Sequence, residues 1–220
     1  VAEAMMRRAE DEKEKRLRNM AQRLRSFTRH GIYRKYFDGP NSLDYKNNLV
    51  VLELDHLKGK KHLQQVVLLQ LIAQLNNEFY LGDRRVPKIL LVDEAWEAFE
   101  DPMVAKFLEG AFRRMRKAAA APVVVTQSLR DLYNSASGEA IANNAANVIV
   151  LRQNGEAIEA LKESGRFNIG DYGYEMLKSL HTEPGQYSEV LFRSGTAWGV
   201  GRFVVDRFSQ LLYSTMASEV

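Results

Sequence analysis

The sequence predicts an α/β protein with a mostly parallel sheet flanked by helices, a C-terminal antiparallel hairpin and an N-terminal helical extension. Short runs of strand-forming residues are apolar throughout instead of alternating, which is typical of strands buried on both faces. Helical patterns separate these runs, and buried strands joined through helices form parallel sheets. A hydrophobic fraction of 45% and a charged fraction of 27% place the 220 residues among ordinary globular proteins.

The first 36 residues are predicted to form the helical extension. Residues 2–29 contain no Gly or Pro and are rich in good helix formers, and Gly31 stands where a helix commonly ends. Residues 1–36 hold 11 Lys/Arg and 5 Asp/Glu, whereas the remainder holds 20 and 23. The basic surplus is therefore local, which is compatible with a nucleic-acid or partner surface and with a plain solvated helix face.

Residues 37–220 are predicted to form the α/β domain. The expected strands, in order, are 49–54, 89–92, 122–126 and 148–151. The expected helices, in order, are 61–81, 102–118, 137–145, 155–163 and 171–180. The hairpin is expected at 187–193 and 197–205, and a last helix is expected to begin near Asp206. Asp101-Pro102 is a strong helix-opening signal, because Asp is a good cap and Pro suits the first helical position.

Composition excludes several classes of protein. The absence of Cys excludes disulfides and thiolate metal sites. No apolar run approaches the roughly 20 residues that cross a bilayer. The chain has no initiator Met and begins in helical character, which predicts a segment of a longer protein.

Two adjacent carboxylates end the second predicted strand. The apolar run Ile89–Val92 is followed directly by Asp93 and Glu94. Ligands of open α/β sheets bind beyond the carboxyl ends of the strands. At that edge Asp93 could hold Mg²⁺ directly or through water, and Glu94 could orient a nucleophilic water. Both residues also have a structural explanation, in which Asp93 caps a helix that starts at Glu94.

Further polar residues follow the neighbouring strands. Gln127 comes after the third strand, where its amide could contact a terminal phosphate, although a loop or capping role also fits. Arg152-Gln153 ends the fourth strand. Arg113 and Arg116 lie late in the helix before the third strand, where arginines can complete a neighbour's site or simply suit a helix C-terminus. Arg202 in the hairpin is a further candidate.

The ordered set of motifs resembles the C-terminal part of the conjugation and type IV secretion ATPases of the TraC type. The resemblance covers most of the chain from about residue 20. The segments that carry it are Phe27–Tyr33, Tyr36–Gly39, Leu49–Leu57, Lys88–Trp96, Phe112–Lys117, Val124–Leu132 and Phe203–Thr215.

The resemblance implies a RecA-like motor domain that uses ATP and Mg²⁺ and works as a homo-oligomer, typically a hexamer. It implies a place at the cytoplasmic face of the inner membrane, among other secretion-channel components, where hydrolysis energises pilus assembly and substrate transfer. Asp93 and Glu94 match the Walker B pair, Gln127 matches the sensor glutamine, and Arg113 and Arg116 fall in the arginine-bearing motif. Residues 1–36 match the end of an all-helical insertion.

One feature of that family is missing from the 220 residues, namely the G-x-x-x-x-G-K-[ST] loop that cradles the phosphates. We therefore expect that the chain alone does not hydrolyse ATP measurably. A DNA-translocating or helicase-like motor of the same fold is an alternative, but the net acidic remainder of the chain disfavours it, so nucleic acid is a possible partner without being indicated. A non-catalytic assembly module is a second alternative.

Overall fold

The computed structural model describes residues 4–5, 7–8, 15–37, 39, 47–57 and 59–213. It divides into two units, Val1–Val67 and Leu68–Val220, and each is described by itself. The α/β class predicted from the sequence is confirmed, because helices alternate with strands that form one parallel and one antiparallel sheet.

The first unit is helical. Its described elements are α2 (Lys15–Leu24), a 3-10 turn (Arg25–Phe27), α3 (Arg34–Phe37), a 3-10 turn (Asp55–Leu57) and the start of α4 (Lys61–Asn76). Much of the first half of the predicted 2–29 helix lies outside the described residues. The chain reverses at Gly31, where a Cβ atom would lie 2.3 Å from the carbonyl oxygen of Arg25. Gly31 is therefore required by the close approach of the backbone.

The predicted strand at 49–54 does not form. These residues have no regular secondary structure and pair with no strand among the described residues. Leu49 and Val51 are 79% and 78% exposed. An apolar run becomes a strand only when a neighbour satisfies its backbone groups, and the sequence pattern cannot show whether that neighbour is present.

The parallel sheet of the second unit has two strands. β1 (Lys88–Val92) pairs with β2 (Ala120–Val124) in a register that sets Lys88 opposite Ala120 and Val92 opposite Val124. α5 (Ala95–Glu100), α6 (Pro102–Arg114) and a 3-10 turn (Met115–Ala118) connect them. The predicted opening of α6 is confirmed, because the Asp101 carboxylate accepts the N–H groups of Met103 and Val104 at 2.9 and 3.2 Å.

The antiparallel sheet contains the predicted hairpin. β5 (Tyr187–Ser194) pairs with β6 (Ala197–Phe203), with the short β4 (Thr182–Glu183) and with β3 (Asn147–Val150). The fourth predicted strand therefore exists, but within the described residues it pairs antiparallel with β5 and not with β2. The single, mostly parallel sheet expected from the sequence is divided into two sheets.

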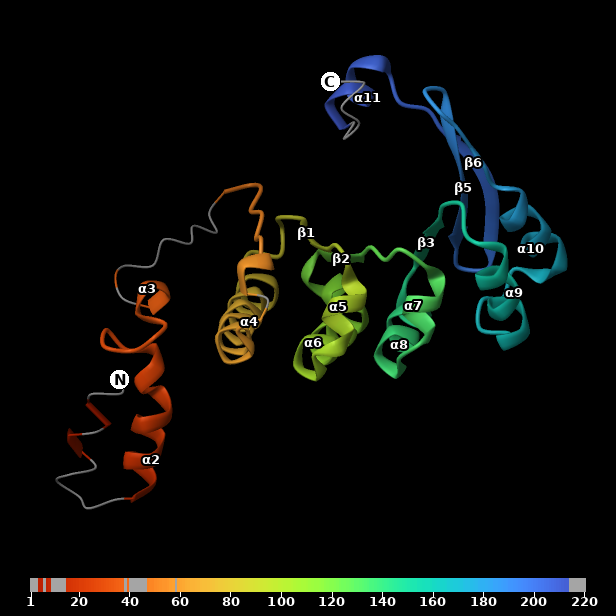
Figure 1. The fold of residues 1–220 in the computed structure, drawn as a ribbon. Coiled ribbons are helices and arrows are strands. Elements are labelled where there is room, and N and C mark those ends of the chain that lie inside the picture. Colours follow the sequence, from red (N-terminus) through yellow and green to blue (C-terminus); the bar gives the residue numbers. More distant parts are fainter. Residues whose placement is uncertain are drawn as a thin grey trace. The chain divides into compact units, whose positions relative to one another are not determined.

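The helices of the second unit include one that the sequence pattern missed, α7 (Leu129–Tyr133). After it come α8 (Ala136–Asn144), α9 (Gly155–Ser164), α10 (Gly170–Ser179) and α11 (Arg207–Tyr213), and a π-helix (Asn77–Leu81) follows α4. Figure 1 shows α5, α6, α7 and α8 on the same side of β1, β2 and β3. The other side of these strands carries exposed apolar residues: Ile89 is 72%, Leu91 60% and Ile149 67% exposed.

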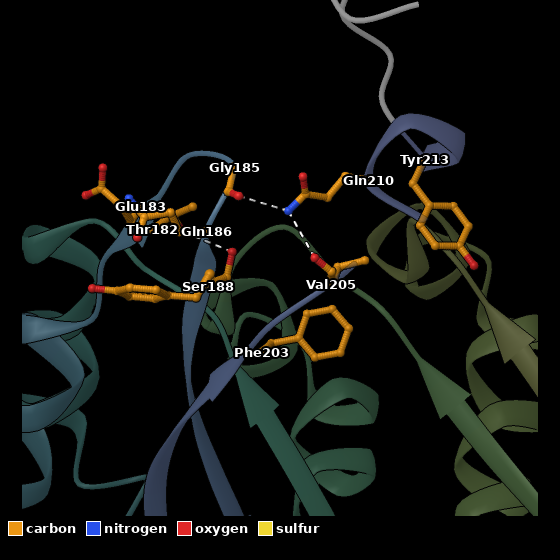
Figure 2. A pocket seen from close by; sticks show the side chains of 10 residues that line it. Thr182, Glu183, Gly185, Gln186, Ser188, Phe203, Val205, Gln210 and Tyr213 are labelled. Atoms are coloured by element: carbon orange, nitrogen blue, oxygen red, sulfur yellow. Dashed lines mark hydrogen bonds between the residues drawn. The ribbon is translucent and has the colours of Figure 1, made fainter. Parts of the chain in front are cut away.

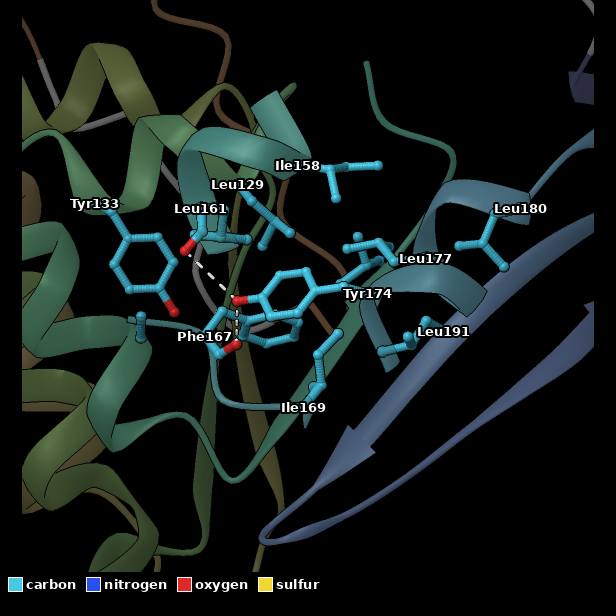
Figure 3. Packing of buried hydrophobic residues seen from close by; sticks show 12 residues of the cluster. Leu129, Tyr133, Ile158, Leu161, Phe167, Ile169, Tyr174, Leu177, Leu180 and Leu191 are labelled. Carbon is cyan, nitrogen blue, oxygen red and sulfur yellow. Dashed lines mark hydrogen bonds between the residues drawn. The ribbon is translucent and has the colours of Figure 1, made fainter. Parts of the chain in front are cut away.

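The largest core lies in the C-terminal half, between α7, α9, α10 and the antiparallel sheet (Figure 3). Its twelve buried members are Leu129, Tyr133, Ala142, Val150, Ile158, Leu161, Phe167, Ile169, Tyr174, Leu177, Leu180 and Leu191. The Tyr174 hydroxyl lies 2.5 Å from the carbonyl oxygen of Phe167, so this buried polar group is satisfied. A smaller cluster under the parallel sheet contains Phe79, Ala111, Met115 and Ala120.

Candidate active site

The carboxyl ends of β1 and β2 are held together by backbone hydrogen bonds. The N–H of Val125 donates to the carbonyl of Val92 at 3.0 Å, and the N–H of Ala95 donates to the carbonyl of Val125 at 2.9 Å. Because the strands are parallel and in register, the segments that follow them emerge at the same edge. Asp93, Glu94 and Gln127 all belong to these segments.

Glu94 and Gln127 meet at this edge although 33 residues separate them. The side-chain nitrogen of Gln127 lies 3.1 Å from both carboxylate oxygens of Glu94. The indole nitrogen of Trp96 donates to the same carboxylate at 2.7 Å. Hydrogen bonds to an ionised carboxylate are stronger than neutral ones, so Trp96 and Gln127 together orient the Glu94 side chain.

The helix that follows Glu94 differs from the sequence expectation. α5 begins at Ala95, its N-cap residue is Glu94, and no side-chain hydrogen bond caps it. Glu94 has φ 49°, in the left-handed region that residues other than Gly, Asn and Asp seldom adopt. The carboxylate of Asp93 accepts the N–H of Glu94 at 2.9 Å. The simple capping explanation, with Asp93 capping a helix that starts at Glu94, is therefore wrong.

Gln127 is not the capping residue of the next helix either. That position belongs to Ser128, whose hydroxyl accepts the N–H of Arg130 at 3.2 Å while the N–H of Ser128 donates to Asp131 at 3.0 Å. Thr126 adds a hydrogen bond from its hydroxyl to the carbonyl of Ser128 at 3.0 Å. These contacts order the turn on both sides of Gln127, so its exposed amide is left to reach Glu94.

The end of β3 reaches the same region through Gln153. Its side-chain oxygen accepts the N–H of Leu129, the first residue of α7, at 3.2 Å. The neighbouring Arg152 is exposed. The expectation that Arg152-Gln153 lies near the segment after β2 is therefore met through Gln153.

Arg113 and Arg116 lie at the opposite edge of the parallel sheet. α6 runs back from the carboxyl ends of the strands, and the turn after it leads directly into β2. There the N–H of Lys88, the first residue of β1, donates to the carbonyl of Ala119 at 3.0 Å. Arg113 forms an ion pair with Glu109 at 2.8 Å, and Arg116 is exposed. A helix of 13 residues spans the sheet, so neither arginine lies beside Glu94 of the same chain. Both predicted explanations, a neighbour's site and a helix C-terminus, are compatible with this position.

Arg202 is held within the hairpin. Its guanidinium lies 4.1 Å from the centre of the Tyr187 ring, and its Nε lies 3.3 Å from a carboxylate oxygen of Glu189. Glu189 also contacts His181 Nδ1 at 2.8 Å. These contacts give Arg202 a structural role in the hairpin.

A pocket of about 360 Å³ lies elsewhere, between β4, β5, the end of β6 and α11 (Figure 2). The Gln210 side chain points across it and donates to the carbonyls of Gly185 and Val205, at 3.1 Å each. The lining includes neither Glu94 nor Gln127. Gln210 fastens α11 to the hairpin, so the pocket reflects the docking of this helix.

The acidic edge offers oxygen ligands suited to Mg²⁺. Within the described residues no cluster of three or more His, Asp or Glu side chains could enclose a metal ion. Mg²⁺ does not need such a cluster, because it commonly binds one or two carboxylates together with water and substrate phosphates. Asp93 and Glu94, both exposed, fit that requirement.

Comparison with known proteins identifies the family. The family model described as the TraG P-loop domain matches residues 2–219. The chain belongs to this family. It is 30% identical over 159 residues to "Protein TraC" of Escherichia coli K12, a match that covers 70% of the chain and 18% of that protein.

A solved structure of VirB4 from Thermoanaerobacter pseudethanolicus has a similar fold. It matches with a TM-score of 0.62 and 21% identity over 95% of the chain and 55% of the solved chain. The resemblance to TraC-type secretion ATPases is thus confirmed at the level of family and fold. The 220 residues span about a fifth of TraC and about half of the VirB4 structure. Within the described residues no helix has the length and apolarity needed to cross a membrane.

One residue of the site was missed by sequence reasoning. Trp96 is not among the site residues predicted from the sequence, yet it is 37% exposed and its indole N–H is bonded to Glu94. The signal was its place in the first turn after an acidic pair. An indole N–H is a donor only, so a Trp two residues from a strand-end carboxylate has an evident acceptor.

Proposed function

We propose that this TraG-family chain is the C-terminal portion of a motor ATPase that energises conjugative type IV secretion, including pilus assembly and the transfer of DNA or protein substrates. The single observation that carries the proposal is the meeting of Glu94 and Gln127 at 3.1 Å beyond the carboxyl ends of two parallel strands. Two side chains with separate structural explanations would have no reason to converge there.

In this proposal each residue at the edge has a role. Asp93 would hold Mg²⁺, which supplies charge neutralisation for the phosphates. Glu94, oriented by Trp96, would polarise the attacking water. Gln127 would contact the terminal phosphate or this water, and its bond to Glu94 would then couple nucleotide state to the turn that begins α7.

The phosphate cradle would come from residues outside these 220, and residues 1–36 would be the end of a helical insertion. The full protein would work at the cytoplasmic face of the inner membrane with other secretion-channel components. A DNA-translocating motor is the alternative within the same fold, and a non-catalytic assembly module is the alternative outside it.

The test compares ATP hydrolysis by the 220-residue chain with that by the longest natural polypeptide that contains it. We expect no measurable turnover from the former and Mg²⁺-dependent turnover from the latter. Glu94→Gln should lower the latter rate by roughly 10²–10⁴-fold, the usual contribution of a general base. Glu100→Gln, at an exposed carboxylate at the end of α5, is the matched control.

Robust turnover by the 220-residue chain that Glu94→Gln abolishes would show that the chain is catalytically complete. Equal rates for the Glu94→Gln and Glu100→Gln proteins would remove Glu94 from the mechanism. A longer polypeptide with no turnover, despite a phosphate loop, would favour the assembly module.

The oligomeric part of the proposal has its own test. Arg113 and Arg116 lie at the edge opposite Glu94, so a catalytic role for them requires the site of a neighbouring copy, as in a ring. The double variant Arg113→Ala/Arg116→Ala and the variant Glu94→Gln should each be inactive. In rings formed at random from a 1:1 mixture of the two variants, about one interface in four joins an intact Glu94 from one copy to intact arginines from its neighbour. About a quarter of the sites should therefore regain activity. No restoration would contradict a role across the interface.

A further inference from the structure

A basic surface covers the first unit from Lys15 to Phe37. These 23 residues include eight Lys or Arg and no Asp or Glu, because all five acidic residues of the extension lie before Lys15. Each of the eight is exposed. They are Lys15, Arg16, Arg18, Arg23, Arg25, Arg29, Arg34 and Lys35. An ordinary solvated helix face mixes both signs of charge, often as i,i+4 pairs. Asp11, Glu12 and Glu14 stand four residues before Lys15, Arg16 and Arg18 but lie outside the described residues, whereas no acidic residue stands within four positions of Arg23, Arg25 or Arg29.

The basic residues of α2 lie on one side of the helix. At about 100° per residue, Lys15, Arg16, Arg18 and Arg23 share one half of the helix surface. Asn19 and Gln22 lie between them, and a shallow hollow on α2 is lined in part by Asn19, Gln22 and Arg23. Amide and guanidinium groups in this arrangement are suited to hydrogen bonds with phosphate oxygens.

The opposite half of α2 is apolar and already largely covered. Ala21 is 1% exposed, and Leu17 and Leu24 are partly buried, whereas Met20 is 51% exposed. A helix that lies in a bilayer interface needs an open apolar face of several large residues. α2 does not offer one, so its charge is better suited to a hydrophilic polyanion than to a lipid surface.

The positive surface extends beyond Phe37 through one long-range contact. The ammonium of Lys60 lies 3.4 Å from the Tyr36 hydroxyl and 5.9 Å from its ring centre, and the ammonium of Lys35 lies 5.0 Å from the same ring. Tyr36 is 39% exposed between these two cations. An exposed aromatic ring flanked by cations is a common element of surfaces that bind single-stranded nucleic acid.

We propose that this basic surface binds the phosphate backbone of a nucleic acid, through charge and without reading sequence. This interaction is independent of the proposed hydrolysis, because it uses none of the residues at the Glu94 edge. It also differs from the composition-based expectation that nucleic acid is not indicated, since the charge that matters is local and not the net charge of the chain.

The experiment measures binding of labelled single- and double-stranded DNA and of single-stranded RNA to the full 220-residue chain. The salt concentration is varied from about 50 to about 300 mM, a range that includes physiological ionic strength. Phosphate contacts make the logarithm of the binding constant fall linearly with that of the salt concentration. The variant Arg16→Gln/Arg18→Gln/Arg23→Gln should bind more weakly. Its slope for single strands should be reduced by about 2, since each phosphate contact contributes about 0.7.

Two matched variants serve as controls. Arg84→Gln/Lys106→Gln/Lys117→Gln removes three exposed cations from the second unit and should leave both affinity and slope unchanged. Arg16→Lys/Arg18→Lys/Arg23→Lys keeps the charge and should retain most of the binding. Gln and Lys are good helix formers, so circular dichroism should show α2 intact in each variant.

Three results would overturn the proposal. The first is an equal loss of affinity in the two neutralised variants, which would indicate a diffuse charge effect. The second is no binding to any oligonucleotide at 50 mM salt, a condition at which about eight cations should bind detectably. The third is binding to vesicles of phosphatidylserine without binding to nucleic acid, which would assign the surface to a membrane.

Discussion

The C-terminal core and the parallel sheet differ in how completely they are covered. The core around Phe167 has twelve buried residues from helices and from the antiparallel sheet, whereas the cluster under β1 and β2 has four. The parallel strands also present exposed residues on one face, including Ile89 and Leu91. Stability is therefore concentrated in the C-terminal half, while the candidate catalytic residues lie at the edge of the less well covered parallel sheet.

The largest effect should come from the centre of the larger core. Phe167 is fully buried, and Phe167→Ala should cost about 3–5 kcal/mol of unfolding free energy because it removes a large side chain and leaves a cavity. Phe192, 44% exposed on the other face of β5, is the matched control, and Phe192→Ala should cost about 1 kcal/mol or less. Urea unfolding of both variants measures the difference. Similar losses would mean that the C-terminal core is not the main source of stability.

The next effect should be local to the parallel sheet. Met115 is fully buried in the smaller cluster, and Met115→Ala should cost about 2–3 kcal/mol. Amide hydrogen exchange should become faster in β1 and β2 and remain slow in α9 and α10, because separate regions open with separate free energies. Uniform acceleration across the second unit would show that the two regions unfold together.

A smaller effect should follow from removing a single buried hydroxyl. Tyr174→Phe keeps the ring in the core but leaves the carbonyl of Phe167 without its donor, which should cost about 1 kcal/mol. Thermal unfolding measures the loss. An unchanged melting temperature would indicate that this carbonyl finds another donor.

A comparable but more local loss is expected at the capping box beside Gln127. Ser128→Ala removes the side-chain cap of α7 and should cost about 1 kcal/mol. The turn that presents Gln127 should loosen, so exchange of the Arg130 amide should rise more than that of amides in α10. Protection that stays the same at Arg130 would contradict the role of the cap.

The smallest effect concerns alkaline pH. Burial raises the pKa of Tyr133 in the larger core. A raised pKa in the folded state means that the contribution is complete below the unfolded value of about 10 and is lost as pH rises above it. Stability should therefore fall above pH 10, and Tyr133→Phe should lessen that fall. Parallel pH profiles for both proteins would assign the alkaline loss to other groups.

The sequence predicted the elements better than their pairing. Ile89–Val92 was recognised as a strand from its apolar run and its acidic end, and β1 confirms it. Residues 49–54 have the same kind of run but pair with no strand in the part of the chain that the structure describes. An apolar run shows that its side chains prefer burial. Whether it forms a strand depends on a neighbouring strand that is distant in sequence.

The site was partly predictable for the same reason. Polar residues after parallel strands share an edge, and this rule places Glu94 and Gln127 at the same edge. The rule does not give side-chain partners, so the indole of Trp96 was missed. Nor does it place Arg113 and Arg116, which a full helix carries to the far edge.

The left-handed backbone of Glu94 has a consequence for how this position evolves. An L-residue with a Cβ atom pays roughly 1 kcal/mol or more to adopt φ near 50°, whereas Gly or Asn adopts it readily. A sequence selected for folding alone would therefore place glycine or asparagine at position 94. Glutamate there exchanges stability for a carboxylate at the sheet edge, so screens for thermostable variants should favour the very substitution that removes the proposed base.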